Sequence, residues 1–237
     1  MKFKLLFAIL LVNVSQVFAH AIWIETSSTG KIGQAQEVKI FLGEYASNER
    51  DSLSHWFSNT AASTLFLTAP DGKKTQLSVT PAGNYLAATF TPAVSGVYTL
   101  SIDLPLTMVY GTTRIHYYAV ATVLVNKSLA GAANVNEATT LTLKTELGKA
   151  NNVNTLYSAS LMNKNVPVKA ASLSVQSPEG WAKTIKSDDN GKFTFNPMWS
   201  GRYLLEGTYT EEGSGTHEGK EYTSTWYCVT YCVDFVK

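Results

Sequence analysis

The sequence predicts an all-β protein made of two tandem Ig-like β-sandwich domains, and three observations support this. Short runs rich in Thr, Val, Tyr and Phe are separated by clusters of Gly, Pro, Asn and Asp, which is the pattern of strands and turns. Charged residues make up 16% of the chain, below the ~25% of an average domain, and helix signals are poor. The two halves of the chain also contain a repeated segment.

Length and composition exclude several classes of protein. A chain of 237 residues has room for one large or two ordinary domains. Its 19 basic residues are balanced by 18 acidic ones, which excludes a strongly basic surface for nucleic acid. A hydrophobic content of 45% excludes a disordered chain, and two cysteines are too few for a disulfide-stapled scaffold.

Residues 1–19 have the pattern of a cleaved secretory signal, with a positive start, an apolar run and small residues at the end. The apolar run is too short to span a bilayer, and no later run reaches ~18 apolar residues. We therefore expect a periplasmic or secreted protein that does not span the membrane once the signal is removed. Cleavage after Ala19 makes His20 the first residue, although cleavage after Ala21 also fits the pattern.

The strand pattern divides the rest of the chain at a polar stretch. We expect a first domain over residues 20–126, a linker over residues 127–136 and a second domain over residues 137–237. The expected strands are residues 22–24, 37–41, 64–67, 85–90, 97–102, 113–125, 141–143, 157–161, 173–175 and 222–236.

The repeat links residues 90–100 with residues 195–205, which share Phe, Pro, Ser, Gly, Tyr and Leu at equivalent positions. Upstream, the Pro-Asp-Gly at residues 70–72 corresponds to the Pro-Glu-Gly at residues 178–180. Two related sandwich units in tandem explain this similarity. Two aromatic pairs should then be buried at equivalent positions: Phe90 with Phe195, and Tyr98 with Tyr203.

The chain has four histidines, and these are the candidate metal ligands. An N-terminal His20 offers its α-amine and its imidazole to the same ion. A second imidazole would complete a three-nitrogen site, which suits Cu, Ni, Co or Zn. In order of preference, the candidate partners are His116, His217 and His55.

Each of these partners also has an ordinary structural interpretation. His116 is expected in a strand, on the face of Arg114 and Tyr118, where a strand histidine commonly forms one hydrogen bond. His217 is expected in a flexible, acidic hairpin loop over residues 210–221. His55 is expected at the surface of a long polar loop that contains a helical turn.

The two cysteines, Cys228 and Cys232, are expected on one face of the last strand. Four residues of strand span ~13 Å, whereas the Cα atoms of a disulfide lie about 4.4–6.8 Å apart. We therefore predict that they do not bridge each other. They are either small buried residues or thiols available to Cu(I).

The residues His20, Trp23 and 43–45, together with the Tyr-rich strand near residue 117, resemble the DUF4198 proteins, which are similar to periplasmic nickel- and cobalt-uptake components. The second half, from residue 165 to residue 203, is similar to carboxypeptidase-regulatory-like Ig domains. The resemblance implies a periplasmic or surface location and a role in transition-metal handling. Only His20 matches the N-terminal His-x-x-Trp pattern of the family.

The first functional interpretation is a non-enzymatic metal-binding protein that passes Ni, Co or Cu to a membrane importer. The alternative is an Ig-like interaction module that contacts an envelope protein or a glycan through Trp23, Trp56 and Trp199. A third interpretation is a copper oxidase with a histidine brace. Mass spectrometry of the mature N-terminus together with metal analysis separates the first two.

Overall fold

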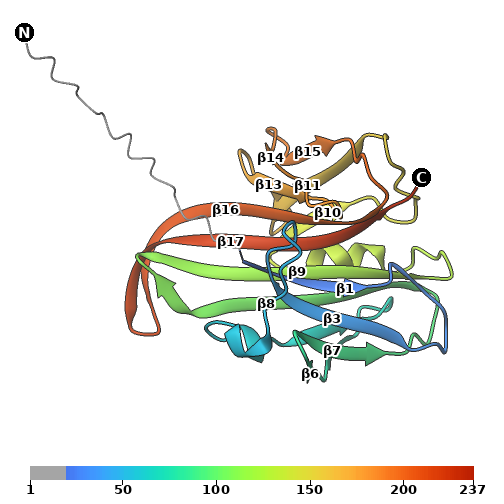
Figure 1. The fold of residues 1–237 in the computed structure, drawn as a ribbon, viewed down its shortest axis with the longest axis horizontal. Helices are drawn as coiled ribbons and strands as arrows, with labels where there is room; N and C mark the ends of the chain where they lie inside the picture. The colour runs from blue at the N-terminus through green and yellow to red at the C-terminus, as the bar shows by residue number, and fades with distance from the viewer. Residues whose placement is uncertain (1–19) are drawn as a thin grey trace, which may run out of the picture.

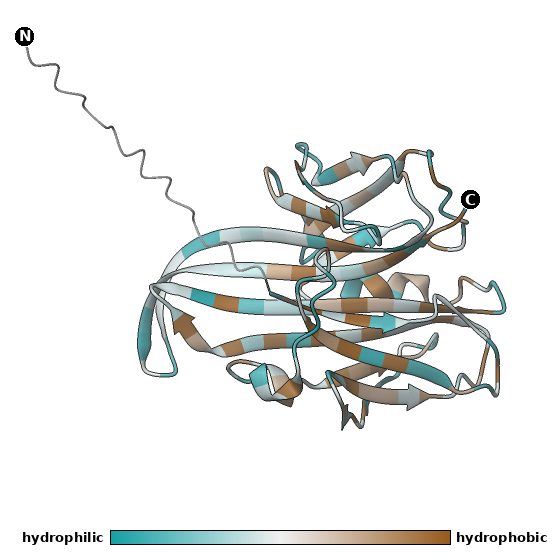
Figure 2. Ribbon diagram, viewed as in Figure 1, coloured by the Kyte–Doolittle hydropathy of each residue, from teal (hydrophilic) through white to brown (hydrophobic). Residues whose placement is uncertain are grey.

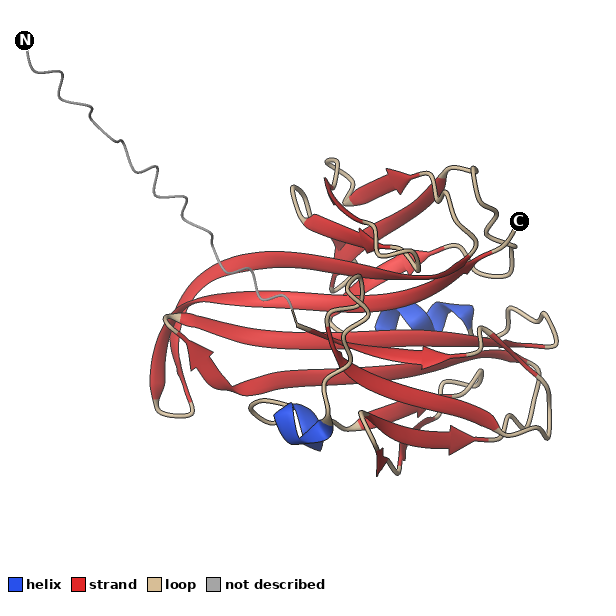
Figure 3. Ribbon diagram, in the orientation of Figure 1, coloured by secondary structure: helices blue, strands red, loops and turns tan. Residues whose placement is uncertain are grey.

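The computed structural model describes residues 20–237, and Figure 3 shows that strands dominate this part of the chain. The prediction of an all-β sandwich fold is confirmed. The proposed signal, residues 1–19, lies outside the described residues. Within the described part, no helix is long and apolar enough to cross a membrane. Its helical elements are the short 3₁₀ turns η1 (Leu53–His55), η2 (Thr60–Ala62) and η3 (Ala132–Glu137).

The strands of the first half are β1 (Ala21–Thr26), β2 (Thr29–Gly30), β3 (Gln36–Gly43), β4 (Leu65–Thr68), β5 (Lys74–Leu77), β6 (Thr80–Ala82), β7 (Tyr85–Phe90), β8 (Gly96–Tyr110) and β9 (Thr113–Val125). Those of the second half are β10 (Leu141–Thr145), β11 (Tyr157–Asn163), β12 (Val166–Pro167), β13 (Ser172–Gln176), β14 (Ala182–Lys186), β15 (Lys192–Phe195), β16 (Gly201–His217) and β17 (Lys220–Phe235). The expected strands at residues 85–90 and 113–125 coincide with β7 and β9.

One large sheet runs through both halves of the molecule (Figure 1). Its strand order is β14-β13-β16-β17-β9-β8-β4-β5, and β2 pairs with β9 in addition. At its centre β17 and β9 run parallel, with Trp226 opposite Ile115 and Tyr231 opposite Val120. Two smaller sheets complete the fold. One has the order β1-β3-β7-β6, and the other joins β10, β11, β12 and β15.

The two hydrophobic cores lie on opposite faces of the large sheet. Tyr117 and Ala119 of β9 belong to the core beneath β1, β3 and β7, whereas Tyr118 and Val120 of the same strand belong to the core beneath β10, β11 and β15. Side chains alternate between the faces of a strand, so β9 contributes to both cores. Figure 2 shows hydrophobic residues concentrated in the sandwiches, while the far ends of β16 and β17 are hydrophilic.

The two halves have equivalent topology, which confirms the internal repeat. From the centre outward, the large sheet runs β9-β8-β4-β5 on one side and β17-β16-β13-β14 on the other. Phe90 ends β7 and packs on Tyr98 of β8, with ring centroids 5.6 Å apart. Phe195 ends β15 and packs on Tyr203 of β16 at 6.5 Å. All four rings are buried at equivalent positions, as predicted.

The repeat also includes a close contact between glycine and proline. Gly96 has φ +144° and faces Pro70, and Gly201 has φ +128° and faces Pro178. A Cβ atom on Gly96 would lie 2.5 Å from Pro70 Cγ and 2.7 Å from the carbonyl oxygen of Ala130. Only glycine fits where the backbone conformation and the neighbouring backbone both exclude a side chain.

We expect Gly96→Ala to lower the free energy of unfolding by about 2–3 kcal/mol, because it combines an unfavourable φ with overpacking. The matched control is Gly213→Ala, because a Cβ atom there would meet no atom within 4 Å. Urea denaturation of both variants measures the difference. Equal stability of the two variants would contradict the packing at Gly96.

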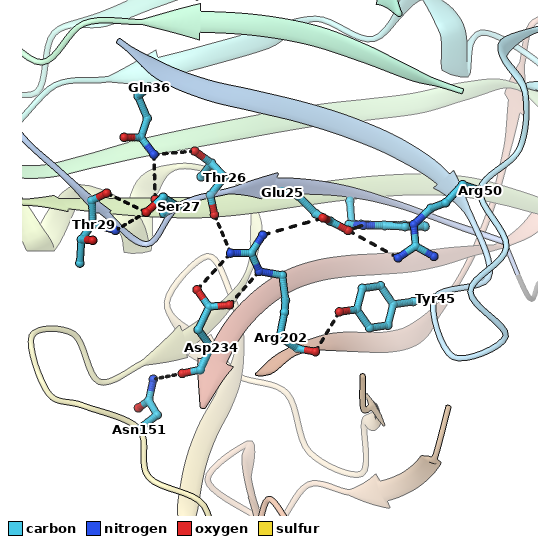
Figure 4. A network of polar contacts seen from close by, with 11 residues as sticks. Glu25, Thr26, Ser27, Thr29, Gln36, Tyr45, Arg50, Asn151, Arg202 and Asp234 are labelled. Carbon is cyan, nitrogen blue, oxygen red and sulfur yellow. Dashed lines mark hydrogen bonds and ion pairs between the residues drawn. The ribbon is translucent and has the colours of Figure 1, made fainter. Parts of the chain in front are cut away.

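Polar contacts around Arg202 join the two halves (Figure 4). Its guanidinium group donates to both carboxylate oxygens of Asp234, at 2.8 and 3.1 Å. It also donates to the backbone carbonyl of Thr26 at 2.9 Å and lies 3.8 Å from Glu25. The hydroxyl of Tyr45 donates to the carbonyl of Arg202 at 2.8 Å. Arg202 therefore ties β1 and the segment after β3 to the ends of β16 and β17.

The expected flexible loop over residues 210–221 is wrong. Strand β16 continues to His217 and β17 begins at Lys220, so the connection is the two-residue turn Glu218-Gly219. Both turn residues have positive φ, as in the tight turns that suit the twist of a hairpin. A β-bulge between Glu212 and Gly215 shifts the pairing register of β16 with β17 and accommodates the glycines of this segment.

Candidate metal centre

His20 directly precedes β1, and its imidazole lies between two carboxylates. Its Nε2 is 3.3 Å from Oδ2 of Asp51, and its Nδ1 is 3.9 Å from Oε1 of Glu44. The side chain of His20 is 39% exposed, so an ion in solvent can reach it. The hydroxyl of Tyr117 donates to the backbone carbonyl of His20 at 2.8 Å, which holds this end of the chain against the large sheet.

Both carboxylates belong to the segment that follows β3. The amide of Asp51 donates to the carbonyl of Leu42 at 2.9 Å, and the indole of Trp56 donates to the carbonyl of Asp51 at 3.1 Å. The amide of Glu49 donates to the carbonyl of Glu44 at 3.0 Å. These bonds fold the segment back on itself and place Glu44 and Asp51 on the same side as His20.

Arg50 fixes this segment from the other side. Its guanidinium group lies over the rings of Trp23, Tyr45 and Phe41, with distances of 4.6, 4.9 and 5.5 Å to the ring centroids. It also pairs with Glu25 at 3.6 Å. Cation–π contacts of this kind strengthen when the cation is desolvated, and the Arg50 side chain is only 17% exposed. Arg50 directly precedes Asp51 in the chain, so these contacts of Arg50 also fix the backbone position of Asp51.

The distances at His20 allow a metal ion, but the side chains alone do not form a complete site. Two ligands with bonds of about 2.0–2.2 Å to one ion lie at most roughly 4.4 Å apart. The 3.9 Å between Nδ1 and Glu44 is within this span. Among residues 20–237, no group of three or more His, Cys, Asp or Glu side chains is arranged to hold a metal. The site therefore needs a further donor.

His116, the preferred partner of His20, lies on the other face of the sheet. It is a strand residue, as predicted, and its Nε2 is 2.6 Å from Oδ1 of Asp103. Its ring stacks on Tyr118 at 4.4 Å, on the side of the second core. Tyr117, which contacts His20, points into the first core. Strand alternation therefore places the side chain of His116 on the face of the sheet opposite to the one that Tyr117 and His20 share.

The other two candidate partners have contacts of their own. Nε2 of His217 donates to the carbonyl of Leu106 at 2.7 Å. His55 ends the 3₁₀ turn η1, and its Nδ1 lies 3.3 Å from the hydroxyl of Ser52. In the described part of the chain, no hydrogen bond or ring contact joins His20 to another histidine. Sequence reasoning chose partners by residue type and missed Glu44 and Asp51. The sequence could have indicated Glu44 and Asp51, because they lie next to Gly43 and Ser52 in a polar segment that follows a predicted strand.

The last strand follows the predicted register. Tyr231 and Val233 face the second core, whereas Cys228 faces the first core and Cys232 packs near Trp23. Both cysteines are free thiols. Burial raises the pKa of both thiols well above the ordinary value, and this opposes the thiolate form that metal ligation requires.

The tryptophans differ in their availability for surface contacts. Trp23 and Trp56 are 0% and 8% exposed, so they are core residues and the proposed role in surface contacts is wrong for them. Trp199 is half-buried and lies beside Trp181, with ring centroids 6.1 Å apart. Of the three tryptophans named from the sequence, only Trp199 presents part of its ring to solvent.

No protein-family model matches this sequence, and no curated protein matches it. Among solved structures, the chain is similar to a DUF4785 family protein from Legionella pneumophila, with 15% identity and a TM-score of 0.31 over 77% of this chain and 51% of that one. It is also similar to a putative membrane-anchored protein from Corynebacterium diphtheriae, with 12% identity and a TM-score of 0.28 over 90% of this chain and 59% of that one. This chain thus spans about half of the first protein and less than two thirds of the second. Neither likeness indicates a function.

Proposed function

We propose that this protein binds a divalent transition-metal ion, Ni, Co or Cu, in the periplasm or outside the cell and supports its uptake through a membrane importer. The observation that carries the proposal is the exposed imidazole of His20 between Asp51 at 3.3 Å and Glu44 at 3.9 Å. The resemblance of the N-terminal His-x-x-Trp pattern to DUF4198 proteins supports the same function.

Each group has a distinct role in the proposed site. Cleavage after Ala19 frees the α-amine of His20, which chelates the ion together with Nδ1. Glu44, on the Nδ1 side, supplies an oxygen ligand. Asp51 contacts Nε2 and orients the ring, as carboxylates beside metal-binding histidines commonly do. A donor set of nitrogen and carboxylate oxygen suits divalent Cu, Ni or Co, whereas Cu(I) prefers sulfur.

We expect Glu44→Gln to weaken the binding of Cu(II) and Ni(II) more than Asp51→Asn does. Glu44→Gln replaces a charged ligand oxygen, whereas Asp51→Asn loosens the orientation of the ring, which costs about 10–100-fold in affinity at comparable sites. The matched control is Glu49→Gln, because Glu49 is an exposed acid of the same segment. Calorimetric titration of protein whose first residue is His20 gives the affinities. Equal affinity in all three variants would exclude both carboxylates from the site.

A further inference from the structure

A cavity of about 450 Å³ lies where the two halves meet. It is open to solvent on one side and is lined by the ends of β9 and β17, by β2, and by residues 145–151, the first of which ends β10. Its volume is in the range of small-molecule sites, about 300–1,000 Å³, and such sites often form between packed units. None of its lining residues belongs to the candidate metal centre.

The inner wall of the cavity is largely apolar. Leu124, Leu147 and Val233 line it. Thr122 and Tyr231 also line it, and their hydroxyl groups are hydrogen-bonded to each other at 2.6 Å. These two hydroxyl groups are therefore already satisfied, and the apolar side chains beside them suit a hydrocarbon body.

The charges at the rim leave one lysine without a counter-ion. Lys149 pairs with Glu146 at 2.8 Å, and Asp234 is paired with Arg202. Lys127 also lines the cavity, and no ion pair involves it among the described residues. Lys127 is therefore the charged lining residue that remains available to pair with an acidic group of a ligand.

The backbone at Lys127 forms a tight turn at the rim of the cavity. Asn126 and Lys127 have φ values of +55° and +57°, and the amide of Ser128 donates to the carbonyl of Val125 at 3.3 Å. This is a tight turn in which glycine is preferred at the second central position. Lys164 has a similar positive φ elsewhere in the described chain, so the turn fixes the position of Lys127 but does not by itself mark a site.

We propose that this cavity binds a small amphipathic anion, with its apolar body against Leu124 and Leu147 and its acidic group at Lys127. The chemical class is a carboxylate with a short hydrocarbon chain. This site is independent of metal binding, because it shares no residue with the candidate metal centre.

Calorimetric titration of the metal-free full chain with octanoate, octanol and octylamine tests the proposal. Octanoate is expected to bind most tightly and octylamine least tightly. Lys127→Gln should weaken octanoate binding about fivefold, the upper range for an exposed ion pair, and leave octanol binding unchanged. The matched control is Lys164→Gln, because Lys164 is another exposed lysine with positive φ and it lies outside the cavity.

A second variant tests the cavity itself. Ser28 is an exposed lining residue, so Ser28→Trp should fill the mouth without disturbing a core and abolish binding of octanoate and octanol together. The proposal is overturned if no probe binds to the unmodified protein, if octylamine binds as well as octanoate, if Lys127→Gln has no effect on octanoate, or if Ser28→Trp leaves binding intact.

Discussion

Glu206→Gln is expected to stabilise the protein above pH 7 and to leave its stability near pH 4.5 almost unchanged. Glu206 is a buried carboxyl group on β16 that accepts a hydrogen bond from Nε2 of Gln176 at 3.0 Å and contacts the thiol of Cys228. Burial raises the pKa of Glu206 to about 7, while the bonds from Gln176 and Cys228 lower it by less. Tyr117, the other titratable group near this carboxyl, adds no positive charge.

The folded protein favours the protonated form of the Glu206 carboxyl group, because burial disfavours the charged form. The folded protein binds the Glu206 proton more tightly than the unfolded chain does, so the stabilisation from the protonated carboxyl is complete below about pH 4.5. It is lost as the pH rises to about 7, and the loss is then about 3 kcal/mol. An amide at this position does not titrate, so the variant avoids the loss.

Urea denaturation of Glu206→Gln and of the unmodified protein, at about pH 5 and about pH 8, measures their free energies of unfolding. The difference between the two should be larger at the higher pH. Glu179→Gln, an exposed acid of the same half, is the control and should show no such trend. If Glu206→Gln is less stable than the unmodified protein at both pH values, the carboxyl group is ionised and paired in the fold, and the pH argument fails.

Arg202→Met is expected to lower the free energy of unfolding by about 2–3 kcal/mol. The change leaves Asp234 and the carbonyl of Thr26 without their partner, and stranding a buried polar group is costly. The side chain of Arg202 is 26% exposed, which places the effect below that of a fully buried pair. Arg202→Lys should be intermediate, because an ammonium group keeps the charge but not the paired bonds to Asp234.

Chemical denaturation of these variants should be compared with Lys149→Met, which removes a pair whose side chains are 75% and 71% exposed. That control should cause no measurable change, because such surface pairs contribute little. Amide hydrogen exchange adds a local readout, since β1 should lose protection selectively in Arg202→Met. A uniform loss across both cores would mean that Arg202 is not what holds β1 to β16.

Many strand positions within the two sandwiches followed from the local pattern of the sequence, but the long extensions of β8 and β16 did not. Alternation placed Cys228 and Cys232 on one face and His116 beside Tyr118, and the structure has both arrangements. The Phe90–Tyr98 and Phe195–Tyr203 pairs identified equivalent strands in the two halves. Each pair joins residues only eight positions apart, so the short repeated segment contains both partners. The parallel pairing of β9 with β17 could not be predicted, because it joins residues more than a hundred positions apart and no local pattern specifies it.

The candidate site was predictable only in part for the same reason. His20 was found because its position after the signal-like segment is a local feature. The side chains that lie near His20 depend on which face of the sheet each residue occupies relative to β1. This arrangement arises only when the sheets assemble, so no local sequence pattern specifies it. Glu44 and Asp51 reach His20 because Arg50 holds their segment against Trp23, a contact between elements distant in the chain.

Calorimetric titration of Cu(II) and Ni(II) into secreted protein whose intact mass shows His20 as its first residue tests the proposed metal site most directly. We expect a single ion to bind per chain, because the α-amine and the imidazole of His20 chelate the same ion. A form with a short Gly-Ser extension before His20 keeps the imidazole, Glu44 and Asp51 but moves the amine away, and it should bind much more weakly. Unchanged affinity in the extended form or in His20→Ala would contradict the metal site and leave the interaction-module alternative in its place.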